Sequence, residues 1–105
     1  MNPAEWLALG GLIRLMLQAD GKVTLRENAA VGDLAIRLGA ELWTALVRAE
    51  LELPSMERTR EQARLVQRPE IRALIRDALE ELARADGLEA SERELLDWLD
   101  EIWAD

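Results

Sequence analysis

The chain has 105 residues, half of them hydrophobic, and contains neither cysteine nor histidine. This length predicts one domain over residues 1–105. Without cysteine and histidine, the chain has no disulfides and no thiolate or imidazole groups, which leaves only carboxylates, hydroxyls, arginines and Lys22 for catalysis, so we do not expect an enzyme. The longest uncharged apolar run, residues 6–13, is far shorter than the ~20 residues of a membrane span. Because the N-terminus also lacks the basic start of a secretory signal, we expect a cytoplasmic protein without a membrane span.

The net charge of −8 is concentrated near the C-terminus. Residues 1–79 contain 11 acidic and 11 basic side chains, whereas residues 80–105 contain ten acidic side chains and two basic ones. The second segment therefore accounts for the whole net charge. We expect it to attract divalent cations by diffuse electrostatics.

Apolar residues recur at helical spacing almost throughout the chain, and no segment alternates as a half-buried strand would. Asn2 and Glu5 have the spacing of a capping box, with Pro3 at the first helical position. Gly39 is placed to end the second helix and Pro54 to end the third. These signals predict an all-α domain of about six helices, over residues 3–19, 24–38, 41–53, 55–66, 69–85 and 91–102.

The triplet Ala-Asp-Gly occurs at residues 19–21 and again at residues 85–87, each time between two predicted helices. A shift of 66 residues superposes these turns and the apolar stripes that precede them. The repeat predicts two helix-turn-helix units with Asp-Gly turns. We expect them to pack as pseudo-symmetric halves in which both stripes are buried, with Leu9, Leu12 and Met16 in the first and Ile75, Ala78 and Leu82 in the second.

The first Asp-Gly turn matches part of a calcium-binding EF-hand loop. Asp20 and Glu27 occupy its fifth and twelfth positions, but the first position falls on Met16, whose thioether is a poor ligand for Ca²⁺. An EF-hand is therefore not predicted. Two interpretations stay open for four acidic residues, which either shape the turns and cap the following helices or bind Mg²⁺ or Ca²⁺ weakly: Asp20, Glu27, Asp86 and Glu94.

These motifs resemble those of the TerB-like family of tellurite-resistance proteins. The resemblance rests on ADGKVT at residues 19–24 with Glu27, on LAIRLG at residues 34–39, and on ARADG at residues 83–87 with Glu92 or Glu94. It implies a small bacterial helical domain that serves as a binding or adaptor module, linked in some members to tellurite and stress resistance. Acidic residues of that family have been proposed to bind divalent cations. The resemblance implies no catalytic mechanism.

Five arginines recur every four residues between residues 60 and 76. On one helix they would form a basic stripe able to meet phosphates or an acidic protein, although Pro69 interrupts such a helix. The alternative is a face that is solvated or paired within the protein. We do not expect nucleic-acid binding from a chain that is acidic as a whole. Three of these arginines are candidates for contact with a protein partner: Arg64, Arg68 and Arg72.

Glycine and tryptophan residues carry further expectations. Gly10 and Gly11 each weaken a helix by about 1 kcal/mol, which favours a close approach of another helix, either within the chain or in a homodimer. Trp103, near the C-terminus, either anchors a protein partner or covers the end of the core. Three other tryptophans fit the core stripes: Trp6, Trp43 and Trp98.

Together these features predict a non-enzymatic TerB-like module that acts through protein contacts, with no cofactor beyond a weakly bound Mg²⁺ or Ca²⁺. Two alternatives come from other functional classes. One is a hydrolase in which the carboxylates of the two turns surround a metal ion. The other is a nucleic-acid binder that uses the arginine stripe, whose binding would collapse with added salt.

Overall fold

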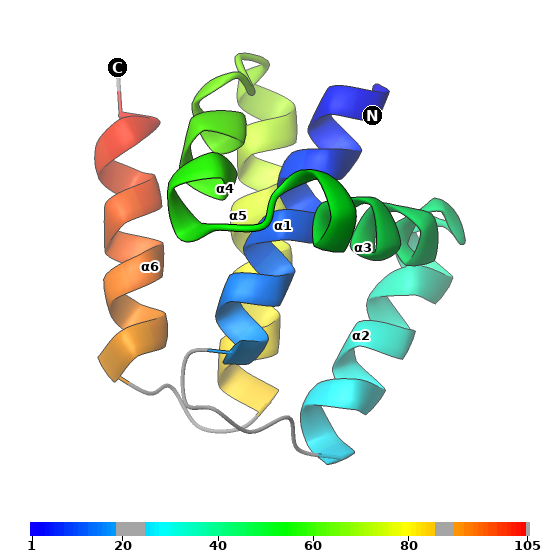
Figure 1. The fold of residues 1–105 in the computed structure, drawn as a ribbon. Coiled ribbons are helices and arrows are strands. Elements are labelled where there is room, and N and C mark those ends of the chain that lie inside the picture. Colours follow the sequence, from blue (N-terminus) through cyan, green and yellow to red (C-terminus); the bar gives the residue numbers. More distant parts are fainter. Residues whose placement is uncertain (19–24, 86–89, 105) are drawn as a thin grey trace.

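The computed structural model describes residues 1–18, 25–85 and 90–104, except for the side chains of residues 25–27. These ranges contain six α-helices and no strand (Figure 1). The prediction of an all-α fold is confirmed, and the described helix ends lie within two residues of the predicted ones. None of the described helices combines the length and the apolar character needed to cross a membrane. The helices are α1 (Pro3–Gln18), α2 (Leu25–Leu38), α3 (Glu41–Glu52), α4 (Met56–Arg64), α5 (Pro69–Ala85) and α6 (Ala90–Ile102).

Local sequence explains where several helices begin and end. At the start of α1, the Glu5 N–H donates to Asn2 Oδ1 and the Asn2 N–H donates to Glu5 Oε1, each over 2.8 Å. The predicted capping box is therefore formed. Ser55 caps α4, because its hydroxyl oxygen accepts a hydrogen bond from the Arg58 N–H at 3.2 Å. Gly39 follows α2 with φ of 126°, in the region where a side chain is disfavoured.

Among the helix ends that differ from the prediction by one or two residues are the start of α6 and the end of α4. Helix α6 begins at Ala90, one residue before the predicted start at Ser91. Helix α4 ends at Arg64, and Leu65 and Val66 continue it only through shorter-range hydrogen bonds to the carbonyls of Gln62 and Ala63. Tightening of this kind is common in a last helical turn.

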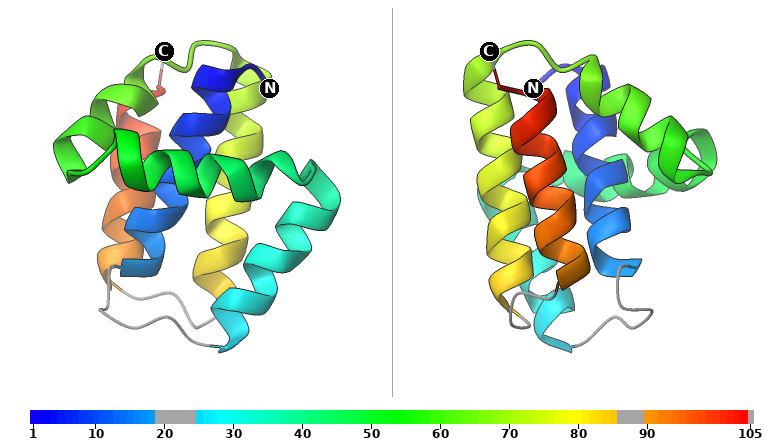
Figure 2. Two further views of the ribbon diagram at one scale, coloured as in Figure 1. Left: turned by 45° about the vertical axis from the view of Figure 1, so that its right-hand side comes forward. Right: turned by 90° about the vertical axis from the view of Figure 1, so that its left-hand side faces the viewer.

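Helix α1 lies at the centre of the molecule, packed against α3, α4 and α5. Figure 2 shows it between α5 on one side and the α3–α4 pair on the other, with α3 crossing it. Helix α5 is the second organising helix, since α1, α2 and α6 all pack against it. The core is formed where these helices meet.

Both apolar stripes of the proposed repeat are buried, as predicted. Exposed fractions are at most 1% for Leu9, Leu12 and Met16 and at most 4% for their counterparts on α5. Helices α1 and α5 run toward the same end of the molecule, and α2 and α6 run back from it (Figure 1). The second helix of each unit packs differently, however. Helix α6 packs against α5, the first helix of its own unit, whereas α2 packs mainly against α5 and α3, which lie outside its unit. The stripes are therefore equivalent, but the two halves do not have equivalent packing partners.

The glycine pair allows close packing within the chain. A Cβ atom at Gly10 would lie 2.5 Å from the Ala45 carbonyl oxygen, so α1 and α3 touch backbone to backbone there. A Cβ atom at Gly11 would lie 2.7 Å from Leu53 Cδ1 and 3.0 Å from Thr59 Cγ2. Of the two expectations for this pair, the structure shows the close approach of an internal helix.

Candidate functional site

Of the four acidic residues considered as cation ligands, the structure describes the side chain of one. Glu94 is exposed on α6, at the edge of a cleft of about 360 Å³ between α1, α4 and α6 that Leu15 and Arg60 also line. The described residues contain no group of three or more acidic side chains that could hold a metal ion. The other predicted ligands lie outside the described residues: Asp20, Asp86 and the side chain of Glu27. The cation site and the hydrolase alternative therefore stay predictions.

The predicted basic stripe is engaged within the protein. The Arg60 and Arg64 guanidinium groups lie 5.0 Å and 5.6 Å from the centroid of the Trp98 ring. These cation–π contacts join α4 to α6. Arg72 Nε donates a hydrogen bond of 2.8 Å to the Val66 carbonyl oxygen, which fixes the segment before α5.

Arg68 contacts a buried carboxylate, that of Glu5 at the start of α1. Arg68 Nε donates to Glu5 Oε2 at 2.8 Å, and a terminal guanidinium nitrogen donates to Oε1 at 2.5 Å. The Glu5 side chain is 4% exposed and that of Arg68 is 50% exposed. Hydrogen bonding from Arg68 is the main cause that lowers the pKa of Glu5 from 4.5 to about 2. The pair ties the N-terminus to the connection between α4 and α5.

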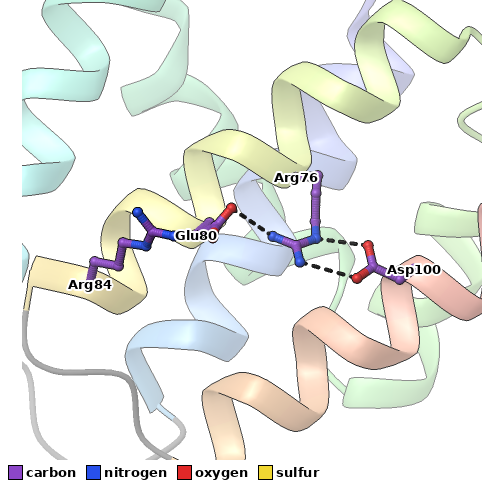
Figure 3. Close-up of polar contacts among 4 residues, drawn as sticks. All are labelled: Arg76, Glu80, Arg84 and Asp100. Atoms are coloured by element: carbon purple, nitrogen blue, oxygen red, sulfur yellow. Dashed lines mark hydrogen bonds and ion pairs between the residues drawn. The ribbon is translucent and has the colours of Figure 1, made fainter.

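Arg76 is the centre of an ion-pair network on α5 and α6 (Figure 3). Its guanidinium group donates two hydrogen bonds to the Asp100 carboxylate, of 2.8 Å and 3.1 Å, and one of 3.1 Å to Glu80. Glu80 also accepts a hydrogen bond from Arg84 at 2.6 Å. Hydrogen bonding from Arg76 lowers the pKa of Asp100. All five arginines of the stripe thus contact another group of the chain, in agreement with the internally paired alternative, although the buried Nε of Arg60 has no hydrogen-bond partner among the described residues.

The tryptophans divide between the core and the surface. Trp6 and Trp98 are partly buried against the core, as predicted. Trp103 is also partly buried there, and its indole N–H donates a 3.0 Å hydrogen bond to the Ala63 carbonyl oxygen. It thus covers the end of the core where α4 stops. The prediction for Trp43 is wrong, because its side chain lies on the outer surface of α3 and is 50% exposed.

Trp43 belongs to an exposed apolar surface that the sequence analysis did not identify. Val47 and Leu51 follow it at intervals of four residues on α3 and are 59% and 77% exposed. Ile36, on the neighbouring helix α2, is 83% exposed. We define these four residues as the α2–α3 face. The opposite side of α3 is buried through Leu42, Ala45 and Ala49.

The α2–α3 face includes a shallow groove between its two helices. The groove encloses about 620 Å³ and is lined mostly by small and apolar residues, including Gly32, Ala40, Ile36 and Trp43. A groove of this shape can accept an apolar side chain from another molecule.

The charges around the face are one-sided. Asp33, Glu41 and Glu50 are exposed on α2 and α3, and no described cation forms an ion pair with them. The described cations of these helices are already paired, Arg48 with Glu52 on its own helix at 2.7 Å and Arg37 with a glutamate of α5. The free charges described at the rim are therefore acidic.

A sequence signal for this face was present in the third predicted helix. Residues 41–53 contain apolar residues on more than one side, so a single buried stripe cannot accommodate all of them. The sequence could indicate that one apolar side of this helix is not buried in the core. It could not indicate which side, because that depends on where α1 crosses α3.

Comparisons of the chain with protein families, with curated proteins and with solved structures find no match. The TerB-like resemblance therefore rests on the short motifs quoted above.

Proposed function

We propose that this chain is a non-enzymatic helical module that binds another protein through the α2–α3 face. The observation that carries the proposal is the exposure of Ile36, Trp43, Val47 and Leu51 over two adjacent helices. Contiguous exposed apolar surface of this kind, rimmed by charge, is typical of protein-interaction sites. The TerB-like resemblance adds the further proposal that the module serves in bacterial stress or tellurite resistance.

Site-specific photo-crosslinking in the native cell tests this proposal. With p-benzoylphenylalanine in place of Val47, we expect irradiation to produce discrete covalent adducts with another protein. Leu65, which follows α4 and is 65% exposed, is the matched control position because its exposure is close to the 59% of Val47. Adducts should be absent or much weaker at Leu65. Equal labelling at both positions, or none at Val47, would contradict a binding role for the face.

Weak cation binding is a separate proposal with its own measurement. We expect millimolar Mg²⁺ and Ca²⁺ to raise the melting temperature slightly and equally, by screening the acidic segment at residues 80–105. Asp20→Asn and Asp86→Asn should leave this effect unchanged. NaCl at matched ionic strength is the control. A saturable stabilisation specific to Ca²⁺, abolished by either substitution, would instead demonstrate a specific site at the Asp-Gly turns.

A further inference from the structure

We infer that the occupant of the α2–α3 face is a basic amphipathic helix of a different polypeptide. The inference rests on the proposed function and specifies the partner of the same surface. Two features of the face carry it: its geometry and the sign of its free charges.

The geometry favours a helix over an extended peptide. Both elements of the face are helices, whose backbone N–H and C=O groups are already hydrogen-bonded within each helix, so there is no strand edge to extend. Trp43, Val47 and Leu51 form a row along α3 at spacing i, i+4, i+8, with Ile36 beside it on α2. Rows of this kind accept apolar side chains spaced three or four residues apart on a second helix. The groove beside Trp43 accommodates one of them.

The sign of the charges selects a basic helix. Asp33 lines the groove, Glu50 directly precedes Leu51 on α3, and Glu41 lies in the first turn of α3; none of the three has a described cationic partner. A helix with lysine or arginine beside its apolar stripe would neutralise them. An acidic helix would bring like charges together at the rim, and the net charge of −8 would repel it during approach.

A two-fold dimer of the chain does not satisfy these requirements. A two-fold dimer through the face would bring two acidic rims together. A head-to-tail contact would need a basic surface on the other copy, and the arginine stripe at residues 60–76 does not provide one, because its arginines are engaged within the chain. Arg60 and Arg64 stack on Trp98, and Arg68 and Arg76 form ion pairs.

The test uses synthetic peptides and the full chain. The probe is a peptide of about 18 leucine and lysine residues patterned as an amphipathic helix, used below its self-association concentration. One control peptide has glutamate in place of lysine, and a second has the same leucine and lysine composition in strict alternation. Fluorescence anisotropy should show the helical lysine peptide binding about tenfold or more tightly than either control. Preference for the glutamate peptide, or equal binding of the alternating peptide, would overturn the inference.

Variants of the chain locate the binding. Trp43→Ser with Val47→Ser should weaken it about tenfold or more, because apolar anchors dominate such interfaces. Asp33→Asn with Glu50→Gln should weaken it several-fold and reduce its salt dependence. Leu65→Ser is the control and should have no effect. Circular dichroism should show all variants folded, since the changed side chains are exposed. Unchanged binding by the Trp43 and Val47 variant would overturn the inference, because the peptide would then be held elsewhere.

The outcomes separate this inference from the proposed function. If crosslinks form at Val47 but the lysine peptide does not bind, the basic-helix inference fails and the interaction function stands. If the crosslinks join two copies of the chain, the occupant is a second copy and the inference also fails. If neither crosslinks nor peptide binding is found, both proposals fail.

Discussion

Replacing Gly10 with alanine should lower the free energy of unfolding by about 2 kcal/mol. The added Cβ would lie 2.5 Å from the Ala45 carbonyl oxygen and 2.7 Å from its carbon, and these backbone atoms cannot move without shifting α3 from α1. Overpacking of this kind costs up to about 3 kcal/mol, and the better helix propensity of alanine offsets about 1 kcal/mol of it. For a domain of this size the melting temperature should fall by roughly 8–16 °C.

Two other glycines make this prediction specific. Gly32, in α2, has no atom within 4 Å of an added Cβ, so Gly32→Ala should stabilise the protein by up to about 1 kcal/mol. For Gly11→Ala the nearest atom is the end of the Leu53 side chain, which can move, so the loss should be smaller than at Gly10. Urea unfolding of the three variants beside the parent measures the order. A Gly10→Ala protein as stable as Gly32→Ala would show that α1 and α3 do not approach each other this closely.

The helices could be predicted because their boundary signals are local. The Asn2–Glu5 capping box, the Ser55 cap and the left-handed Gly39 each act within a few residues, so a single sequence contains all the information needed. The burial of both apolar stripes follows equally from spacing, since α1 and α5 have no polar side chains along those rows.

The candidate site could not be predicted because it depends on tertiary packing. Helical periodicity shows that α3 is apolar on more than one side, but the crossing of α1 through Gly10 decides that Ala45 is buried and Trp43 exposed. The groove also needs α2 and α3 to lie side by side, which no local signal specifies. The same holds for Glu5. Its capping role could be predicted from adjacent residues, but its ion-pair partner could not, because Arg68 lies 63 residues away in the sequence.

The second large effect should appear when Glu5 is replaced by glutamine. Glu5 is almost completely buried, caps α1 and accepts two hydrogen bonds from Arg68. Loss of its charge weakens both contacts while the shape of the side chain is kept. Because Arg68 is half exposed, solvent screens part of the pair. We expect Glu5→Gln to lower the free energy of unfolding at pH 7 by about 1–2 kcal/mol.

The pH dependence of this difference identifies its cause. The pKa of Glu5 is about 2 in the folded protein, against an ordinary value of 4.5, so the unfolded chain takes up the proton first as the pH falls. The stabilisation by the ionised carboxylate is therefore complete above about pH 4.5 and is lost as the pH falls toward 2. Urea unfolding of parent and Glu5→Gln proteins should show a constant gap at neutral pH that closes across this window.

A matched substitution separates the buried pair from surface electrostatics. Glu52 is also paired with an arginine, Arg48, through hydrogen bonds of 2.7 Å and 3.3 Å, and this contact lowers the pKa of Glu52. It is exposed and lies at the C-terminal end of α3, where a negative charge opposes the helix dipole. Glu52→Gln should therefore have little effect at any pH. Two results would contradict this role for the ionised Glu5–Arg68 contact. The loss in free energy of unfolding could be no larger for Glu5→Gln than for Glu52→Gln, or it could persist unchanged at pH 2. In either case another interaction would hold the N-terminus to the segment before α5.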